Sequence, residues 1–451
     1  MEEEKKIGRR EFLRGTAMLG IAGTGLLSSC GKSGGQTPLR QPGEYYIPEL
    51  PDKAVAGRKL KVGMVGCGGR GTGALGNLLD AADDIEVVAL GDIFQNNLDD
   101  CRRKIKASYG REVPDENCFL GFDAYKKVID SGIDMVILTT PPLFRPEQFA
   151  YATEKGVHSF LEKPVAVDPK GYRQIVATSR LAEVKGLSVV TGTQRRHQRD
   201  YVAAYEKIQQ GIIGQITGGT VYWLQGNPWY CTRTPEMTDM EYMIRDWFNW
   251  KWLSGDHIVE QHVHNIDVFM WMTGLKPFKA TGFGARHRRR SGDQFDMFYV
   301  DFEFEKGVRL HSQCRQIDGC SNRVGEVIQG TKGYWRSNGC EFFDLEGNSI
   351  WKYDKEAAEK QYAQHDPYVL EHVDWVNHIR KGTTHVEAED AALSCLAGMM
   401  GRESAYDGRR VLWDEYEASQ QSFMPETLEI CNVDMSQYRV PEPGVYDKKS
   451  K

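Results

Sequence analysis

The chain has 451 residues, of which 40% are hydrophobic and 27% are charged, and its formal net charge is −6. This length predicts two or three domains with a substantial core, and the acidic balance gives no reason to expect a nucleic-acid partner. The ten cysteines are scattered without a C-x-x-C pair, which argues against a cysteine zinc site and against a disulfide framework.

Residues 1–30 are typical of an export signal rather than of a folded domain. Arg9 and Arg10 precede an apolar region, Gly15 to Ser29, that is too short to span a bilayer. The arginine pair resembles a twin-arginine signal, and the segment ending at Cys30 resembles a lipoprotein cleavage box. We therefore expect a periplasmic protein that is exported by the twin-arginine route and lipid-anchored at Cys30, with no other membrane contact.

Residues 31–57 are rich in Gly, Pro, Ser and Lys and are expected to form a linker or an arm. After them, residues 58–192 alternate short apolar runs with helical patterns. The predicted strands are Leu60–Val65, Ile85–Leu90, Met135–Thr139, Val157–Leu161 and Leu187–Thr191. This alternation predicts a parallel, doubly wound Rossmann sheet in an α/β fold.

A glycine-rich turn connects the first predicted strand to a predicted helix that begins near Thr72. Its glycines fit G-x-G-x-x-G, a pattern that allows a tight turn, a close approach of a pyrophosphate and close helix–strand packing. The phosphates would then lie at the helix N-terminus. The residues expected to contact the dinucleotide here are Gly66, Gly68, Gly69, Arg70 and Gly71.

Asp92 follows the second predicted strand, 21 residues after Gly71. An acid at this position accepts hydrogen bonds from the adenosine ribose hydroxyls and favours NAD. Arg70, beside the phosphates, leaves NADP open. Without the glycine turn, Asp92 would be interpreted as a helix N-cap.

Two further motifs follow predicted strands at the same edge of the sheet. Thr140 and Pro141 begin T-P-P after the third strand, and Glu162 and Lys163 begin E-K-P after the fourth. Open α/β sheets bind ligands at the carboxyl ends of their strands. We therefore expect all four residues to contact the cofactor.

Together, G-x-G-x-x-G, T-P-P and E-K-P resemble the Gfo/Idh/MocA family of nucleotide-dependent sugar and inositol oxidoreductases. The resemblance covers about residues 58–415. It implies that Lys163 reaches the nicotinamide ribose and the substrate, and that Pro164 is cis. It also implies a second, α+β domain over residues 193–425 with an open, mostly antiparallel sheet, which family members use to form dimers or tetramers. Arg145 stands where the family usually has a histidine.

The second domain carries a carboxylate–histidine motif. If residues 256–267 are helical, Glu260, His264 and Asp267 share one face, and a carboxylate one turn from a histidine supports a general base. The family motif D-x-x-x-H-x-x-D matches at His264 and Asp267, with Glu260 in place of the first Asp. The resemblance implies that His264 takes the substrate's hydroxyl proton. A metal on His257, Glu260, His262 or His264 is the competing interpretation, and we expect none.

The substrate is expected to contact Arg195, Arg196, Trp250 and Asp267. Trp250 belongs to an aromatic stretch, Asn227 to Trp252, whose density suits stacking on sugar rings but also suits a domain interface. Residues 426–451 are expected to be a tail.

The predicted activity is oxidation of a ring hydroxyl of a sugar, glycoside or polyol, with a tightly bound NAD that is recycled in the site. NADP is the alternative cofactor. One alternative function is an NAD-dependent glycoside hydrolase that oxidises C3 transiently. Another is a sugar-binding lipoprotein without catalysis.

Overall fold

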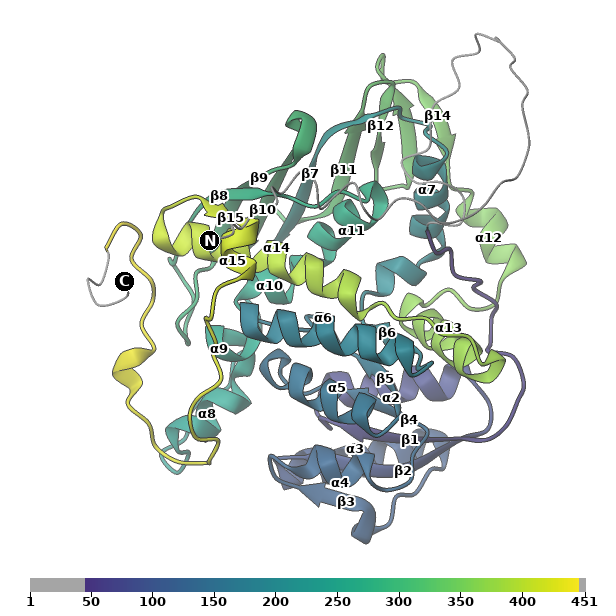
Figure 1. Cartoon of the computed structure of the whole chain (residues 1–451), viewed down its shortest axis with the longest axis vertical. Coiled ribbons are helices and arrows are strands. Elements are labelled where there is room, and N and C mark those ends of the chain that lie inside the picture. The colour runs from purple at the N-terminus through teal and green to yellow at the C-terminus, as the bar shows by residue number, and fades with distance from the viewer. Residues whose placement is uncertain (1–44, 446–451) are drawn as a thin grey trace, which may run out of the picture. The chain divides into compact units, whose positions relative to one another are not determined.

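The computed structural model describes residues 45–445, which contain two β-sheets and the helices packed on them (Figure 1). The expected twin-arginine signal and Cys30 lie outside the described residues. The predicted fold class is confirmed: a parallel Rossmann-like sheet precedes a domain with a mostly antiparallel sheet.

The first sheet has six parallel strands in the order β3-β2-β1-β4-β5-β6. Its strands are β1 (Leu60–Val65), β2 (Ile85–Asp92), β3 (Cys118–Leu120), β4 (Met135–Leu138), β5 (His158–Leu161) and β6 (Val189–Thr191). The chain reverses its direction of travel across the sheet between β1 and β4. This is the topological switch point at which doubly wound sheets bind ligands.

Helices cover both faces of this sheet. They are α2 (Gly69–Ala81), α3 (Gln95–Tyr109), α4 (Ala124–Ile129), α5 (Arg145–Glu154), α6 (Pro169–Val184) and α13 (Pro367–Lys381), with 3-10 turns η1 (Asp115–Asn117) and η2 (Pro142–Phe144). One apolar core packs α2, α3 and α13 against the strands, and another includes side chains of α4, α5 and α6. Helix α6 begins at Pro169, because the Asp168 side chain accepts from the Gly171 N–H and Pro169 occupies the first turn.

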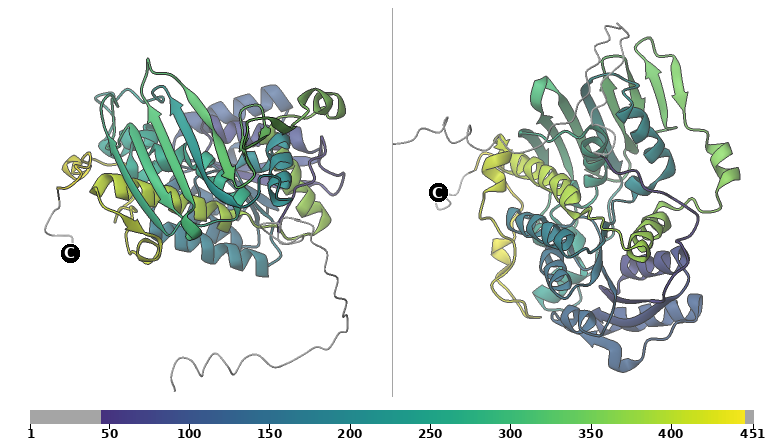
Figure 2. Two further views of the ribbon diagram at one scale, coloured as in Figure 1. Left: turned by 90° about the horizontal axis from the view of Figure 1, so that it is seen from above. Right: turned by 45° about the vertical axis from the view of Figure 1, so that its right-hand side comes forward.

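The second sheet has nine strands in the order β14-β13-β12-β11-β7-β10-β9-β8-β15, and only β7 and β10 pair in parallel. Its strands are β7 (Ile216–Gln225), β8 (Lys279–Ala285), β9 (Met297–Glu303), β10 (Arg309–Gln316), β11 (Arg323–Gly330), β12 (Gly333–Arg336), β13 (Glu341–Asp344), β14 (Ser349–Lys352) and β15 (Val411–Leu412). The left view of Figure 2 shows its outer face toward the viewer, with the helices of the described chain behind it.

The inner face of this sheet packs on α11 and α14. The remaining helices and turns of the described chain are α7 (Arg199–Gln209), α8 (Asp239–Arg245), α9 (Lys251–Ser254), α10 (His257–Glu260), α11 (Val263–Thr273), α12 (Lys355–Gln361), α14 (Ala388–Asp407), α15 (Trp413–Glu417), η3 (Gln194–His197), η4 (Trp247–Asn249), η5 (Glu305–Gly307) and η6 (Met435–Gln437). A Cβ at Gly219 of β7 would lie 2.7 Å from the Phe269 ring of α11, so the glycine permits this close packing.

The sequence did not predict β3, α4 or β13. Each has at most six residues, which is too short for a periodic pattern. The expectation of one helix through Glu260, His264 and Asp267 is wrong, since α10 ends at Glu260 and α11 begins at Val263.

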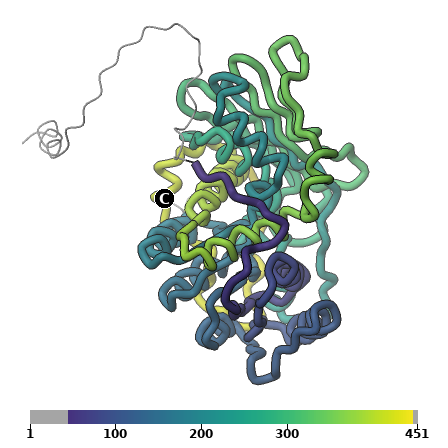
Figure 3. The backbone as a smooth tube through the Cα atoms, turned by 90° about the vertical axis from the view of Figure 1, so that its right-hand side faces the viewer, coloured from purple at the N-terminus to yellow at the C-terminus, as the bar shows by residue number. Residues whose placement is uncertain are grey.

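The described part of the N-terminal arm lies on the body of the protein. Figure 3 shows it, in purple, passing beside α13. The Tyr46 hydroxyl donates to Asp374 at 2.7 Å, and Ala54 and Val55 bond to residues of α2 and α13. This anchoring places the first strand next to the helices that cover it.

The C-terminal segment also packs on the body, at least as far as residue 438. Tyr438 contacts Trp250 edge-on, with ring centroids 5.9 Å apart, and the Met240 N–H donates to the Cys431 carbonyl. Figure 1 shows this segment, in yellow, descending beside α9 and α8. Among residues 45–445, no helix combines the length and the hydropathy that a membrane span requires.

Candidate active site

The glycine turn has the geometry that a dinucleotide phosphate needs. Gly66 has φ +93°, and a Cβ there would lie 2.7 Å from the Thr139 backbone. A Cβ at Gly71 would lie 1.8 Å from the Gly66 carbonyl oxygen, so this position also requires glycine. At Gly68, the N-cap of α2, and at Gly69, its first residue, a Cβ would meet open space. The turn therefore leaves room for an anion at the N-terminus of α2.

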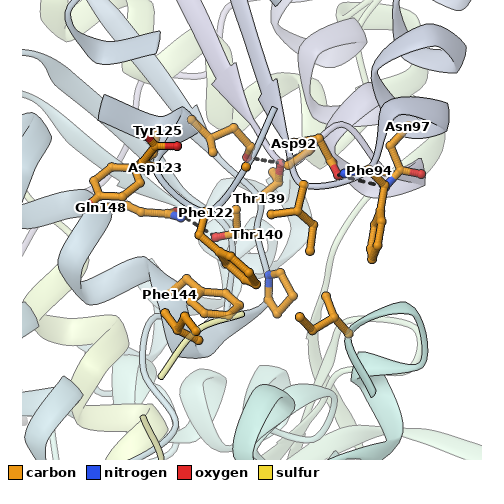
Figure 4. A pocket seen from close by; sticks show the side chains of 18 of the residues that line it. Asp92, Phe94, Asn97, Phe122, Asp123, Tyr125, Thr139, Thr140, Phe144 and Gln148 are labelled. Carbon is orange, nitrogen blue, oxygen red and sulfur yellow. Dashed lines mark hydrogen bonds between the residues drawn. The ribbon is translucent and has the colours of Figure 1, made fainter. Parts of the chain in front are cut away.

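A cavity of about 310 Å³ opens beside this turn, at the switch point between β1 and β4 (Figure 4). Gly66, Gly68, Asp92, Thr140 and Pro141, all expected cofactor contacts, line it. The Thr140 hydroxyl donates to Gln148 at 2.7 Å. Its lining also includes large apolar side chains, namely Phe94, Phe122, Phe144, Ile244, Trp247 and Leu428. Polar groups facing apolar side chains suit a nucleoside.

Asp92 lies at the end of β2 and is nearly buried. Its carboxylate accepts from the N–H groups of Cys67 (2.7 Å) and Phe94 (2.8 Å) and from the Asn97 amide (3.2 Å). Burial raises the pKa of Asp92, although these hydrogen bonds oppose the rise. A carboxylate has about four acceptor positions, so Asp92 retains capacity for a ribose hydroxyl.

Arg70 and Glu162 bind each other at the entrance to the E-K-P turn. The Arg70 guanidinium donates to Glu162 and, at 3.4 Å, to Glu371 of α13, and its centre lies 4.8 Å from the Tyr368 ring. In the structure these two side chains contact each other, and their contact with the cofactor stays a prediction.

Lys163 lies at the carboxyl end of β5 and contacts the second domain. Its Nζ donates to the Glu260 carboxylate at 2.9 Å and to the Glu260 carbonyl at 2.7 Å. Both side chains are largely buried, with exposures of 12% and 6%. The peptide bond from Lys163 to Pro164 is cis, as the family resemblance implies. The fold therefore brings Lys163 and Glu260, which are 97 positions apart in the sequence, into contact, as a catalytic pair requires.

His264 lies in the first turn of α11, with its ring stacked on Trp223 of β7 at 5.7 Å between centroids. Burial, together with the charges of Lys163, Arg195 and Arg70, holds the pKa of His264 well below its ordinary value. The imidazole is therefore neutral at neutral pH and can accept a proton. The predicted pairing of Glu260 with His264 is replaced by the pairing of Glu260 with Lys163.

Of the four residues expected to contact the substrate, only Arg195 lies beside Lys163, Glu260 and His264. Its guanidinium donates to Glu326 and lies 5.8 Å from the Trp223 ring. Arg196 instead forms a bidentate pair with Asp267, at 3.0 and 2.7 Å, and both side chains are buried. We therefore assign Arg196 and Asp267 to the scaffold rather than to substrate binding.

Trp250 is also removed from the expected substrate contacts. It is 5% exposed and belongs to an apolar cluster with Met240, Met243, Trp252 and Leu253. Its aromatic neighbours are Tyr242 and Tyr438. This location agrees with the alternative that the aromatic stretch forms a domain interface.

The histidines considered for a metal have other partners. His257 contacts Asp256 at 2.9 Å, and His262 Nε2 contacts the Ser312 hydroxyl at 2.8 Å. Both rings are fully buried. They orient the α10–α11 connection and do not join Glu260 and His264 around a common point.

The sequence did not indicate four residues near the site: Trp223, Glu326, Glu371 and Leu428. Each reaches the site from a distant part of the chain, so no local motif marks it. The sequence did single out Arg145, because it stands where the family usually has a histidine. It is buried and donates to the Pro164 carbonyl, and burial lowers its pKa to about 10.

Two family models match the chain. An oxidoreductase family with an NAD-binding Rossmann fold matches residues 60–191, and a GFO/IDH/MocA C-terminal domain matches residues 201–336. The boundary between these matches lies between the two sheets.

Curated relatives are similar at low identity. Scyllo-inositol 2-dehydrogenase (NAD(+)) of Bacillus subtilis is 22% identical over 365 residues, which cover 78% of this chain and 97% of that protein. A glycosyl hydrolase family 109 protein of Shewanella pealeana is 24% identical over 399 residues, which cover 80% of this chain and 81% of that protein. The similarity therefore extends over both domains.

Solved structures share the fold. Scyllo-inositol dehydrogenase from Lactobacillus casei, with bound NAD(H) and scyllo-inositol, has a TM-score of 0.60 and 21% identity, covering 79% of this chain and 99% of that one. GenD2 from gentamicin A biosynthesis, in complex with NAD, has a TM-score of 0.60 and 19% identity, covering 81% and 99%. With the glycine turn, the E-K-P motif and both family models in agreement, the chain belongs to the Gfo/Idh/MocA family of NAD-binding oxidoreductases.

Proposed function

We propose that the protein oxidises a ring hydroxyl of a sugar, glycoside or polyol, using a tightly bound NAD. The observation that carries this proposal is the contact of Lys163 with Glu260, beside a neutral His264 and at the sheet edge that holds the glycine turn. The inositol dehydrogenase among the relatives supports a polyhydroxylated ring as the substrate class.

The three side chains have complementary roles in removing a hydroxyl proton. His264 accepts the proton, because its neutral imidazole has an unprotonated ring nitrogen. Lys163 has three N–H donors, of which Glu260 takes two, so the third can donate to the substrate oxygen and stabilise its developing negative charge. Glu260 fixes the position of Lys163.

The unpaired oxygen of Glu260 indicates where a substrate binds. Oε2 is buried and has no hydrogen-bond partner among the described residues. A buried acceptor without a donor is costly, and a second hydroxyl of a polyol would satisfy it. This favours substrates with vicinal hydroxyl groups.

The chain's own residues provide the cofactor site. When bound, NAD supplies the acceptor for the hydride that leaves the substrate carbon. Gly68 and Gly69 leave space for its phosphates, and Asp92 faces the cavity from the end of β2. Trp247 and Leu428 of the second domain and the C-terminal segment line the same cavity, which supports slow release of the nucleotide.

Export would make slow release necessary, because no NAD pool exchanges with a protein outside the cytoplasm. A cofactor that stays bound must be restored in the same site. Either a second substrate is reduced, or one substrate is oxidised and then reduced again. The second course is that of the alternative function, a glycoside hydrolase, which the family 109 relatives support.

The first experiment is denaturation of the purified protein, followed by mass and redox analysis of the released nucleotide. We expect about one NAD per chain. Mixing native protein with inositols and glycosides should then reduce that NAD in a single turnover, which nicotinamide absorbance measures. Lys163→Met and His264→Ala should each slow this step by about 10²–10⁴-fold and leave the nucleotide bound.

Lys207→Met is the matched control, because Lys207 is only half-buried, lies in α7 and contacts Gln210. Near-normal turnover in the Lys163 or His264 variants would contradict the proposal. A chromogenic glycoside, supplied without an acceptor, separates the two activities. Release of the aglycone that depends on both residues would favour the hydrolase.

A further inference from the structure

A second cluster of ionisable groups, three of them buried and three partly or fully exposed, lies away from the candidate active site. It forms where η3, α13, the segment before α14 and the N-terminal arm meet. Its members are His197, Asp374, His378, His385, Glu387 and Tyr46. Neither the redox proposal nor the nucleotide site uses these side chains.

Three of them form a set typical of a zinc site. Asp374, His378 and His385 each offer a ligand atom within 4.8 Å of the other two. Asp374 Oδ1 and His378 Nε2 are 3.7 Å apart. Tetrahedral zinc with bonds of 2.0–2.1 Å separates its ligand atoms by about 3.3 Å, so this edge needs to close by only about 0.4 Å.

The neighbours of these three residues orient them as a second shell would. The His378 Nδ1 contacts the Thr383 hydroxyl at 2.7 Å, so Nε2 faces Asp374 and the Tyr46 hydroxyl. His197 lies 3.1 Å from the other oxygen of Asp374, and Glu387 lies 3.3 Å from His385 Nε2. Such partners fix ring orientation and raise ligand basicity in metal sites.

The charges of the cluster also suit a cation. Asp374 and Glu387 are 3% and 6% exposed, and among the described residues only histidines form ion pairs with these two carboxylates. Their neutral hydrogen-bond donors include Tyr46, which donates to Asp374, and Thr191, which donates to Glu387. Buried carboxylates are normally balanced by a cation or a metal.

The Tyr46 hydroxyl marks the open coordination position. It lies 2.7 Å from Asp374 Oδ1 and 2.8 Å from His378 Nε2, between the two ligand atoms. Tyr46 is 38% exposed, while His378 and His385 are each 15% exposed at the side chain, so an ion can enter from this side.

We propose that Asp374, His378 and His385 bind one Zn²⁺, with the fourth position on the Tyr46 side. The ion would join the N-terminal arm to α13 and to the segment leading into α14. Because His197 follows Arg195 and Arg196 in η3, the ion would also stiffen the turn that places Arg195 beside His264. Its role is structural and does not depend on the proposed redox reaction.

The test uses the full chain after treatment with a chelator. Calorimetric titration with Zn²⁺ alone should give one site per chain, and metal analysis after dialysis should recover one zinc. His378→Ala and His385→Ala should each weaken binding by about 10–100-fold. His311→Ala is the matched control, because His311 is an exposed histidine of β10 that also pairs with a carboxylate, Asp301.

A measurement on the unaltered protein covers the case in which a variant fails to fold. Co²⁺ in place of Zn²⁺ should produce the intense visible absorption of a tetrahedral site, and added Zn²⁺ should abolish it. The proposal is overturned if the unaltered chain binds no stoichiometric Zn²⁺, or if both histidine variants bind it as tightly as the parent. Either result would mean that the cluster is a hydrogen-bond network that anchors Tyr46.

Discussion

Helix α11 contributes to two buried charged groups that differ in how completely their hydrogen bonds are satisfied. Asp267 accepts two hydrogen bonds from Arg196 and a third from Ser394 at 2.7 Å. Three residues earlier, His264 faces the region of Lys163 and Glu260, where one carboxylate oxygen has no partner in the described chain. A satisfied pair stabilises the fold, whereas an unsatisfied group is available to a ligand.

The largest expected effect comes from breaking the satisfied pair. Asp267→Asn leaves the buried Arg196 guanidinium without its main carboxylate and should lower the free energy of unfolding by about 3–5 kcal/mol. Urea denaturation, followed by tryptophan fluorescence, measures this loss. Substrate affinity in the surviving folded protein should change little.

Glu260→Gln is the counterpart in the unsatisfied group. Lys163 keeps the Glu260 carbonyl as an acceptor at 2.7 Å, so the loss of stability should be smaller than that of Asp267→Asn. Its turnover should fall sharply instead. The comparison fails if Glu260→Gln destabilises the protein as much as Asp267→Asn, or if Asp267→Asn abolishes turnover while stability is retained.

The pH dependence of the single-turnover rate should show the state of His264. The group must be neutral to accept a proton, and its pKa lies well below the ordinary 6.5, because of burial and the nearby Lys163 and Arg195. The single-turnover rate constant should therefore still have its maximal value at pH 6.5 and should fall only at distinctly lower pH. Rapid-mixing measurements across the acid range test this.

His311→Ala is again the control, because an exposed histidine should leave that acid limb unchanged. An acid limb at or above pH 6.5 would show that His264 is not the proton acceptor in this environment.

The same contrast explains how much the sequence predicts. Gly66 and Gly71 were identifiable because their backbone constraints are local: a side chain there would collide with neighbouring backbone. The E-K-P turn was identifiable because it follows a buried strand. The parallel sheet and most of its helices follow from periodicity for the same reason.

The partners of charged side chains could not be predicted, because they come from distant segments. Glu371, which contacts Arg70, lies 301 residues away, and Glu326, which holds Arg195, lies 131 residues away. The break between α10 and α11 was also invisible, because no Gly or Pro interrupts the sequence from His257 to Thr273. Local pattern identifies the motif, and tertiary packing decides which of its residues face the ligand.

The smallest expected effects are those of replacing two tryptophans, Trp250 and Trp223, which should differ in whether they change stability or the single-turnover rate. Trp250 lies in the apolar cluster, so Trp250→Phe should cost about 1–2 kcal/mol of stability and leave the KM for substrate within about twofold. Trp223 stacks on His264, so Trp223→Phe should change the single-turnover rate several-fold with a smaller loss of stability. Trp223 is the less buried of the two rings, which is why its loss should disturb the packing less. If Trp250→Phe raised KM strongly and Trp223→Phe had no effect on the rate, the aromatic stretch would have to be returned to the substrate site.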